Sequence, residues 1–126
     1  MSYINGVSIE GASLTKMLSD KLYAISGEGI FRRTKDLLDI YIMSYISEYR
    51  AKDVIEIWNH TERIPGDFSV FKNEKGRIRD AYIKMKGIEN KPDFDEMYER
   101  VSCFILPFCE IEDIADVIWQ KAEWRQ

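Results

Sequence analysis

The chain has 126 residues, of which 45% are hydrophobic and 32% are charged, and its formal net charge is −4. This length predicts one globular domain, residues 1–126, and the negative charge argues against a generally basic nucleic-acid binder. No apolar run reaches the roughly 18 residues that a membrane span needs, and the first ten residues lack a secretory signal pattern. We therefore expect a cytoplasmic protein that does not enter a membrane.

The residue types that often carry chemistry are scarce. Cys103 and Cys109 are too few for a disulfide framework and are not spaced as zinc ligands, so we predict reduced core residues and no metal site. His60 is the single histidine. Without a second histidine and a suitably placed nucleophile, no Ser-His-Asp or Cys-His set can be assembled. Asp93 and Asp95 have the spacing of a magnesium-binding pair, but they follow a proline, and we interpret them as the start of a helix.

The first elements in chain order are a short β element and a helix. Residues 3–9 place Asn5-Gly6 between β-preferring residues, which fits either a hairpin or a lone strand whose partner lies outside the chain. Ser13 can cap a helix that ends at the glycines of residues 26–29. Lys21 lies near the middle of its apolar stripe, so the ammonium either reaches past the core to water or pairs with an anion. The stripe consists of Leu14, Met17, Leu18, Leu22 and Ile25.

Residues 31–45 predict the central helix, which continues to about residue 49 and is apolar on nearly every side. Its first turns nevertheless carry Arg33, Lys35, Asp36 and Asp39. The two aspartates are three residues apart and therefore point the same way. These charges either complement the helix dipole and pair along the helix, or they form a site at the mouth of a buried helix.

Four more helices are predicted, at residues 51–60, 73–86, 93–105 and 110–124, with a brief extended piece at 68–71. The fold class is therefore all-α: an irregular bundle of about six helices with a short N-terminal β element. Residues 72–91 hold seven Lys or Arg against three Asp or Glu. This local excess either steers an anionic ligand or forms one solvated helix face.

Two segments resemble a known family. Asp20-Lys21-Leu22-x-Ala24-Ile25, a short loop and then the run from Arg33 to Tyr41, RTKDLLDIY, resemble the abortive-infection nucleotidyltransferases of the AbiEii/AbiGii type. Residues 86–94 also look like the C-terminal part of that family, and the match covers roughly residues 7–108. The lysine-bearing helix followed by R-x-K-D-x-x-D is the more specific part of the resemblance.

The resemblance implies a helical half that closes over a nucleotidyltransferase core. Lys21 would neutralise a triphosphate, with Arg33 and Lys35 as helpers. Asp36 and Asp39 would orient Lys21 or accept a proton from the acceptor hydroxyl. Family members transfer nucleotides to RNA ends, and the basic helix is a weak candidate for a track along the RNA backbone. The residues of that track would be Lys75, Arg79, Lys84 and Lys86.

The departure from the family is large, because residues 1–126 contain neither the Gly-Ser turn nor a metal-binding pair behind a strand. We therefore predict a detached helical half that is inactive alone; nucleoside triphosphate and Mg²⁺ are implied only for a complete member. Its partners would be a nucleotide or RNA, the missing catalytic half or an antitoxin. The alternative is a standalone interaction module, and a third hypothesis is a small enzyme that uses Lys21 and both aspartates without metal.

Overall fold

The computed structural model describes residues 2–4, 7–9, 11–109 and 116–125 and is mainly helical, which confirms the predicted fold class. The helices are α1 (Gly11–Ile25), the 3₁₀-helix η1 (Glu28–Arg32), α2 (Thr34–Ile46), α3 (Ala51–His60), α4 (Ser69–Asn73), α5 (Lys75–Lys84), α6 (Phe94–Phe104) and α7 (Leu106–Cys109). The strands are β1 (Ser2–Ile4), β2 (Val7–Ile9), β3 (Tyr49–Arg50), β4 (Ile118–Gln120) and β5 (Glu123–Arg125).

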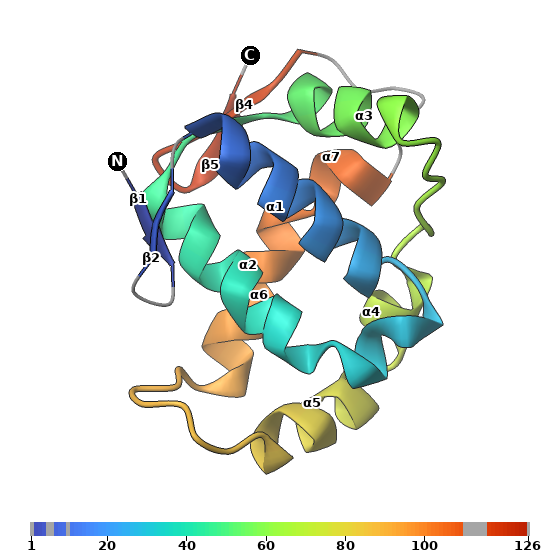
Figure 1. The fold of residues 1–126 in the computed structure, drawn as a ribbon. Coiled ribbons are helices and arrows are strands. Elements are labelled where there is room, and N and C mark those ends of the chain that lie inside the picture. Colours follow the sequence, from blue (N-terminus) through green and yellow to red (C-terminus); the bar gives the residue numbers. More distant parts are fainter. Residues whose placement is uncertain (1, 5–6, 10, 110–115, 126) are drawn as a thin grey trace.

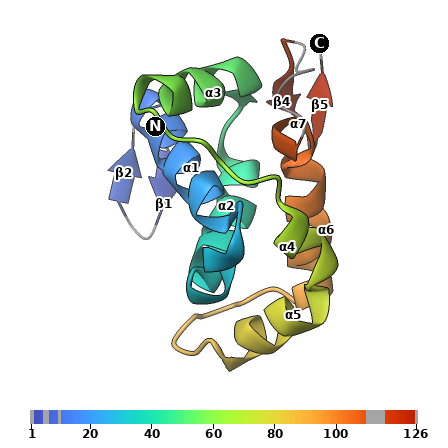
Figure 2. The same ribbon diagram turned by 90° about the vertical axis from the view of Figure 1, so that its right-hand side faces the viewer.

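Helices α1 and α2 lie side by side in the middle of the molecule (Figure 1). The turned view shows α1, α2 and α3 on one side, facing α6 and the β4–β5 hairpin on the other (Figure 2). Leu37, Ile40 and Met43 of α2 are fully buried in the core between these layers. Tyr45, by contrast, is 58% exposed, so α2 is not covered on every side as its sequence suggests.

The N-terminal β element is a hairpin, not a lone strand. Strands β1 and β2 pair antiparallel, with Ser2 opposite Ile9 and Ile4 opposite Val7. The inference of a missing partner strand from this segment is therefore wrong. Helix α1 begins at Gly11, which places Ser13 inside the first turn instead of at the predicted cap.

The loop before α4 is fixed against the end of α1. Ser26 accepts a hydrogen bond from the Gly66 amide through its hydroxyl and one from the Phe68 amide through its carbonyl. A Cβ on Gly66 would lie 2.3 Å from the Ser26 carbonyl oxygen, so a side chain does not fit there. Phe68 adopts a left-handed conformation and is buried, and residues 69–73 are helical, so the predicted extended piece at 68–71 is wrong.

The C-terminal segment differs most from expectation. Residues 118–120 and 123–125 form strands, so the helix predicted over 110–124 is wrong for them, while residues 110–115 lie outside the described part. Strand β4 pairs with β3 and β5, with Trp119 opposite both Tyr49 and Trp124. Because Tyr49 belongs to β3, α2 ends at Ile46 instead of near residue 49. The rings of Trp119, Trp124 and Tyr49 all contact Phe104 of α6.

Candidate functional site

Lys21 of α1 meets both aspartates of α2. Its Nζ donates to Asp36 Oδ1 at 3.1 Å and to Asp39 Oδ2 at 2.7 Å. The side chains are 17%, 8% and 5% exposed, respectively. The ammonium of Lys21 therefore pairs with anionic groups and does not reach past the core to water. These anions are two aspartates of the same chain. The buried stripe of α1 turns Lys21 towards α2, and the three-residue spacing turns both carboxylates back towards it.

Arg33 completes the cluster, which we call the Lys21 cluster: Lys21, Arg33, Asp36 and Asp39. Arg33 Nε donates to Asp36 Oδ2, and the guanidinium side chain is 56% exposed. The formal charges of the four side chains cancel, so the cluster itself has no net charge. Lys35 is exposed and forms no hydrogen bond or ion pair within the described part of the chain, so the structure does not bring it into the cluster.

The protonation of Lys21 reflects two opposing effects. Burial lowers the pKa of Lys21, but the hydrogen bonds and negative charges of Asp39 and Asp36 outweigh burial and raise this pKa above its ordinary value. Lys21 is therefore an ammonium throughout the physiological range. An ammonium has three N–H donors, and the two aspartates account for two of them. The third donor has no acceptor among the described residues, which leaves one position for an outside oxygen.

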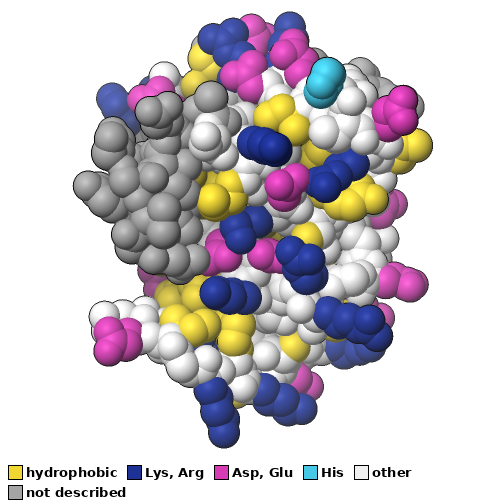
Figure 3. Space-filling model, viewed as in Figure 1, with side chains coloured by type: hydrophobic (Ala, Val, Ile, Leu, Met, Phe, Trp, Pro, Cys, Tyr) yellow, Lys and Arg dark blue, Asp and Glu magenta, His cyan; other side chains and the backbone are white. Residues whose placement is uncertain are grey.

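The Lys21 cluster is a tightly closed arrangement. Its residues line none of the described cavities at Ser44, Phe31 and Leu106. Lys, Arg, Asp and Glu side chains are interleaved across the middle of the face in Figure 3. A phosphate that reached Lys21 would therefore meet an ammonium whose charge is already balanced, and it would have to compete with the carboxylates.

The basic helix α5 divides into paired and unpaired cations. Lys75 and Arg79 both reach Asp95 of α6, at 3.9 Å and 3.3 Å. Lys84 is the last residue of α5, and Lys86 lies beyond its end, so the helix predicted over 73–86 is wrong at that residue. Both lysines are exposed and form no ion pair or hydrogen bond with the described residues. Lys and Arg side chains gather along the lower part of the face in Figure 3, where α5 lies. Of the predicted RNA-facing residues, only Lys84 and Lys86 therefore have uncompensated charges.

The remaining residues considered in the sequence, Asp93, His60 and the two cysteines, lie outside the Lys21 cluster. Asp93 lies at the N-cap of α6 but makes no side-chain cap hydrogen bond, so the predicted capping bond is absent at that residue. His60 is exposed in the last turn of α3. Cys109 is half-buried and Cys103 is exposed, which makes the predicted core position of Cys103 wrong; both are free thiols.

Sequence reasoning missed Arg100 of α6, which bridges to α2. Its Nε donates to Ser44 Oγ at 2.9 Å and its Nη2 donates to the Ser44 carbonyl at 3.1 Å. The only signal in the sequence was an arginine one residue before the buried Val101, and helix periodicity does not distinguish such a residue from a solvated one.

The described residues contain neither a metal-binding cluster nor a membrane-spanning helix. No group of three or more His, Cys, Asp and Glu side chains that could hold a metal ion occurs in residues 2–4, 7–9, 11–109 and 116–125. None of the described helices is both long and apolar enough to cross a membrane.

Comparison with known proteins gave no relative. No family model matches the chain, and no curated protein or solved structure matches it. The nucleotidyltransferase resemblance therefore depends on the motifs around Lys21, Asp36 and Asp39, and any function drawn from it is a proposal.

Proposed function

We propose that this chain is the helical half of an AbiEii/AbiGii-type nucleotidyltransferase and that Lys21, Asp36 and Asp39 face the nucleotide. One observation carries the proposal. Asp36 and Asp39 of α2 lie 15 and 18 positions after Lys21 in the chain, and both accept a hydrogen bond from its ammonium. These are the residues at which the sequence resembles that family. A separate catalytic half would supply the Gly-Ser turn and the acids that bind Mg²⁺.

Each residue has a defined part in the proposed site. The unpaired N–H of Lys21 donates to a phosphate oxygen of a nucleoside triphosphate, and Asp39 and Asp36 hold the ammonium in place. Arg33, which is more than half exposed, swings from Asp36 towards the phosphates and adds a second positive charge. Lys84 and Lys86 attract the backbone of the RNA acceptor.

Nucleotide binding by the full chain tests this proposal. We would titrate ATP, GTP, CTP and UTP, each with and without Mg²⁺, into ¹⁵N-labelled protein and follow amide shifts at Lys21, Arg33 and Asp39. We expect millimolar binding to at least one nucleotide and a loss of about tenfold in affinity in Lys21→Gln, because a charge-assisted hydrogen bond is removed.

Lys16 provides the matched control because it is an exposed lysine on the same helix without a described partner. Lys16→Gln should bind nucleotide as the wild type does. Lys21→Arg, which keeps the charge in the cluster, guards against loss of fold and should retain part of the affinity. Unchanged affinity in Lys21→Gln would contradict the proposal. Transfer of labelled nucleotide to RNA by the chain alone with Mg²⁺ would contradict the need for a catalytic half.

The second candidate function is an interaction module, and the surface beside β5 favours it. Leu106 is 63% exposed and lines an apolar cavity of about 440 Å³ together with Trp124 and Pro107. Strand β5 pairs only with β4 among the described strands, so its other edge is open to a partner. Binding of a purified catalytic half or antitoxin that is lost in Leu106→Asp and kept in Lys21→Gln would favour this function.

A further inference from the structure

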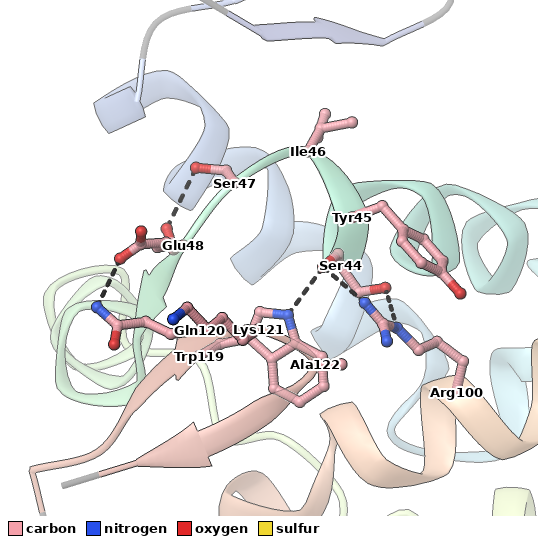
Figure 4. Close-up of a pocket in the computed structure, with 10 residues that line it drawn as sticks. All are labelled: Ser44, Tyr45, Ile46, Ser47, Glu48, Arg100, Trp119, Gln120, Lys121 and Ala122. Atoms are coloured by element: carbon pink, nitrogen blue, oxygen red, sulfur yellow. Dashed lines mark hydrogen bonds between the residues drawn. The ribbon is translucent and has the colours of Figure 1, made fainter.

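A cavity of about 490 Å³ lies at the C-terminal end of α2, between that helix, α6 and the turn that joins β4 to β5 (Figure 4). Its volume falls within the range of about 300 to 1,000 Å³ that is usual for small-molecule sites. Two cations, Arg100 and Lys121, and one carboxylate, Glu48, are among its lining residues. The cavity therefore has a net positive charge.

Arg100 is held rigidly at the wall of this cavity. It reaches from α6 to Ser44 and donates both to the hydroxyl and to the carbonyl of that residue. Its guanidinium carbon lies 3.9 Å from the centre of the Tyr45 ring and 5.1 Å from the Trp119 ring. The indole N–H of Trp119 donates to the same Ser44 carbonyl at 2.8 Å. These contacts fix the guanidinium before any ligand arrives.

The contacts with Ser44 leave one edge of the guanidinium free. They use the edge formed by Nε and Nη2, whereas the edge formed by Nη1 and the second N–H of Nη2 has no acceptor among the described residues. Two parallel N–H groups on such an edge match the two oxygens of a carboxylate or a phosphate. This edge of Arg100 therefore has the geometry for bidentate binding of an oxyanion.

Lys121 adds a second charge. It is exposed and has no described partner, and it lies in the two-residue turn between β4 and β5. The third charge, Glu48, accepts a hydrogen bond from the Gln120 amide at 2.7 Å and forms no ion pair with either cation. No described side chain therefore neutralises Lys121 or the free edge of Arg100.

We propose that this cavity binds a small ligand through an oxyanion, a phosphate or a carboxylate, which contacts the free edge of Arg100 and the ammonium of Lys121. The site is separate from the Lys21 cluster, because Asp36 and Asp39 lie in the N-terminal half of α2, whereas the cavity is lined by its last three residues, Ser44 to Ile46, and by no residue of the cluster. Its occupancy therefore does not depend on nucleotide binding at Lys21.

The indole N–H of Trp119 reports on the site directly, and the other two indole N–H groups serve as references. Trp119 donates to Ser44, whereas Trp58 donates to Ser19 and Trp124 to Phe104, both outside the contacts of Arg100. We would titrate inorganic phosphate and, separately, acetate into ¹⁵N-labelled full-length protein at constant ionic strength. Saturable movement of the Trp119 indole signal is expected, with the Trp58 signal as the internal reference. A response to phosphate alone or to acetate alone identifies the oxyanion class.

Two variants connect the response to the two cations. Lys121→Asn removes the charge at a residue whose φ is +49°, a conformation that asparagine tolerates, so the fold is preserved. Arg100→Lys keeps the positive charge but removes the two parallel N–H groups of the guanidinium. We expect affinity to fall about threefold or more in Lys121→Asn and about tenfold in Arg100→Lys. Lys52→Asn, at an exposed lysine of α3 away from the cavity, should bind as the wild type does.

The proposal fails if neither anion moves the Trp119 signal in a saturable manner. It also fails if affinity is unchanged in both Lys121→Asn and Arg100→Lys, because the anion would then bind elsewhere. The Lys21→Gln variant distinguishes this site from the proposed nucleotide site. Its phosphate response at Trp119 should equal that of the wild type, whatever it does to nucleotide binding.

Discussion

The two ends of α2 hold a cation in opposite ways. At the N-terminal end, Lys21 lies between Asp36 and Asp39, and the charges of its cluster cancel. At the C-terminal end, Arg100 is fixed by a neutral serine and two aromatic rings, and its charge is not compensated by these contacts. The first arrangement uses the cation mainly to hold two helices together, and the second leaves the cation available to a ligand.

Because of this difference, substitutions in the two places should change different quantities: the free energy of unfolding in one case and the affinity for an anion in the other. Removal of one partner from a closely paired cluster leaves buried charge uncompensated, so the cost appears in the free energy of unfolding. Removal of the free cation Lys121 costs little folding energy, so the cost appears in the affinity for an anion.

The largest effect is expected for Lys21→Met. Asp36 and Asp39 are almost fully buried and would lose their shared ammonium, so we expect the free energy of unfolding to fall by about 2 to 4 kcal/mol. Urea unfolding followed by circular dichroism measures the change. Lys16→Met on the exposed side of α1 is the matched control and should differ from the wild type by about 0.5 kcal/mol or less. Equal stability of the two variants would show that the cluster does not hold α1 to α2.

The next effect appears at alkaline pH, where tyrosine and lysine deprotonate. Burial and then the negative charges of Asp93 and Glu96 raise the pKa of Tyr82 to about 12. Because the folded pKa exceeds the unfolded value near 10, the contribution of Tyr82 to stability is complete below pH 10 and decreases between pH 10 and 12. After allowance for solvent screening, we expect a loss of about 1 to 2 kcal/mol in that window, and Tyr82→Phe should remove it.

Deprotonation of Lys21, in the cluster between α1 and α2, also lowers the free energy of unfolding at alkaline pH. Its pKa is also raised, so its stabilising contribution is complete below the unfolded value of 10.5 and decreases as pH rises beyond it. The wild type should therefore lose more stability above pH 10.5 than Lys21→Met does. Parallel pH curves for the wild type and Lys21→Met would contradict the assignment.

The sequence alone was enough for the elements whose information is local. Helix α3 has the predicted bounds, Ala51 to His60, because its apolar residues recur at helical spacing and no tertiary contact overrides them. Local spacing showed only that Asp36 and Asp39 point the same way and that Lys21 lies near the middle of its apolar stripe. That Lys21 pairs with these two aspartates was implied by the family resemblance alone, because spacing within one helix does not determine which residues of another helix it meets.

The C-terminal hairpin could not be predicted in the same way. Trp119 and Trp124 are five positions apart, a spacing that a helix or a hairpin can accommodate, and β4 is fixed by pairing with Tyr49 far away in the chain. Its turn, Lys121-Ala122, lacks the Asn-Gly or Asp-Gly pair that usually marks a two-residue hairpin. The cavity beside Arg100 was not predicted, because one of its walls is that hairpin.

A smaller effect is expected for Ser44→Ala. The buried Ser44 hydroxyl donates to the Tyr41 carbonyl at 2.6 Å and accepts from Arg100 Nε, so its loss leaves a charged donor without a partner. We expect a loss of about 1 to 2 kcal/mol in unfolding free energy, measured in urea. Ser102→Ala is the control, because among the described residues that hydroxyl bonds only to the carbonyl of Tyr98 in its own helix, and its loss should be smaller. A larger loss in Ser102→Ala would mean that Ser44 does not anchor Arg100.

The smallest effect is a gain in stability. Lys121 and Ala122 have φ values of +49° and +69°, which asparagine and glycine adopt more readily. Replacing the pair with Asn-Gly should raise the free energy of unfolding by about 1 kcal/mol, measured in urea against the wild type. The same double variant lacks the ammonium of Lys121, so its affinity for phosphate should fall while its stability rises. A joint fall in both quantities would indicate that the turn is disrupted, and a joint rise would show that Lys121 does not bind the anion.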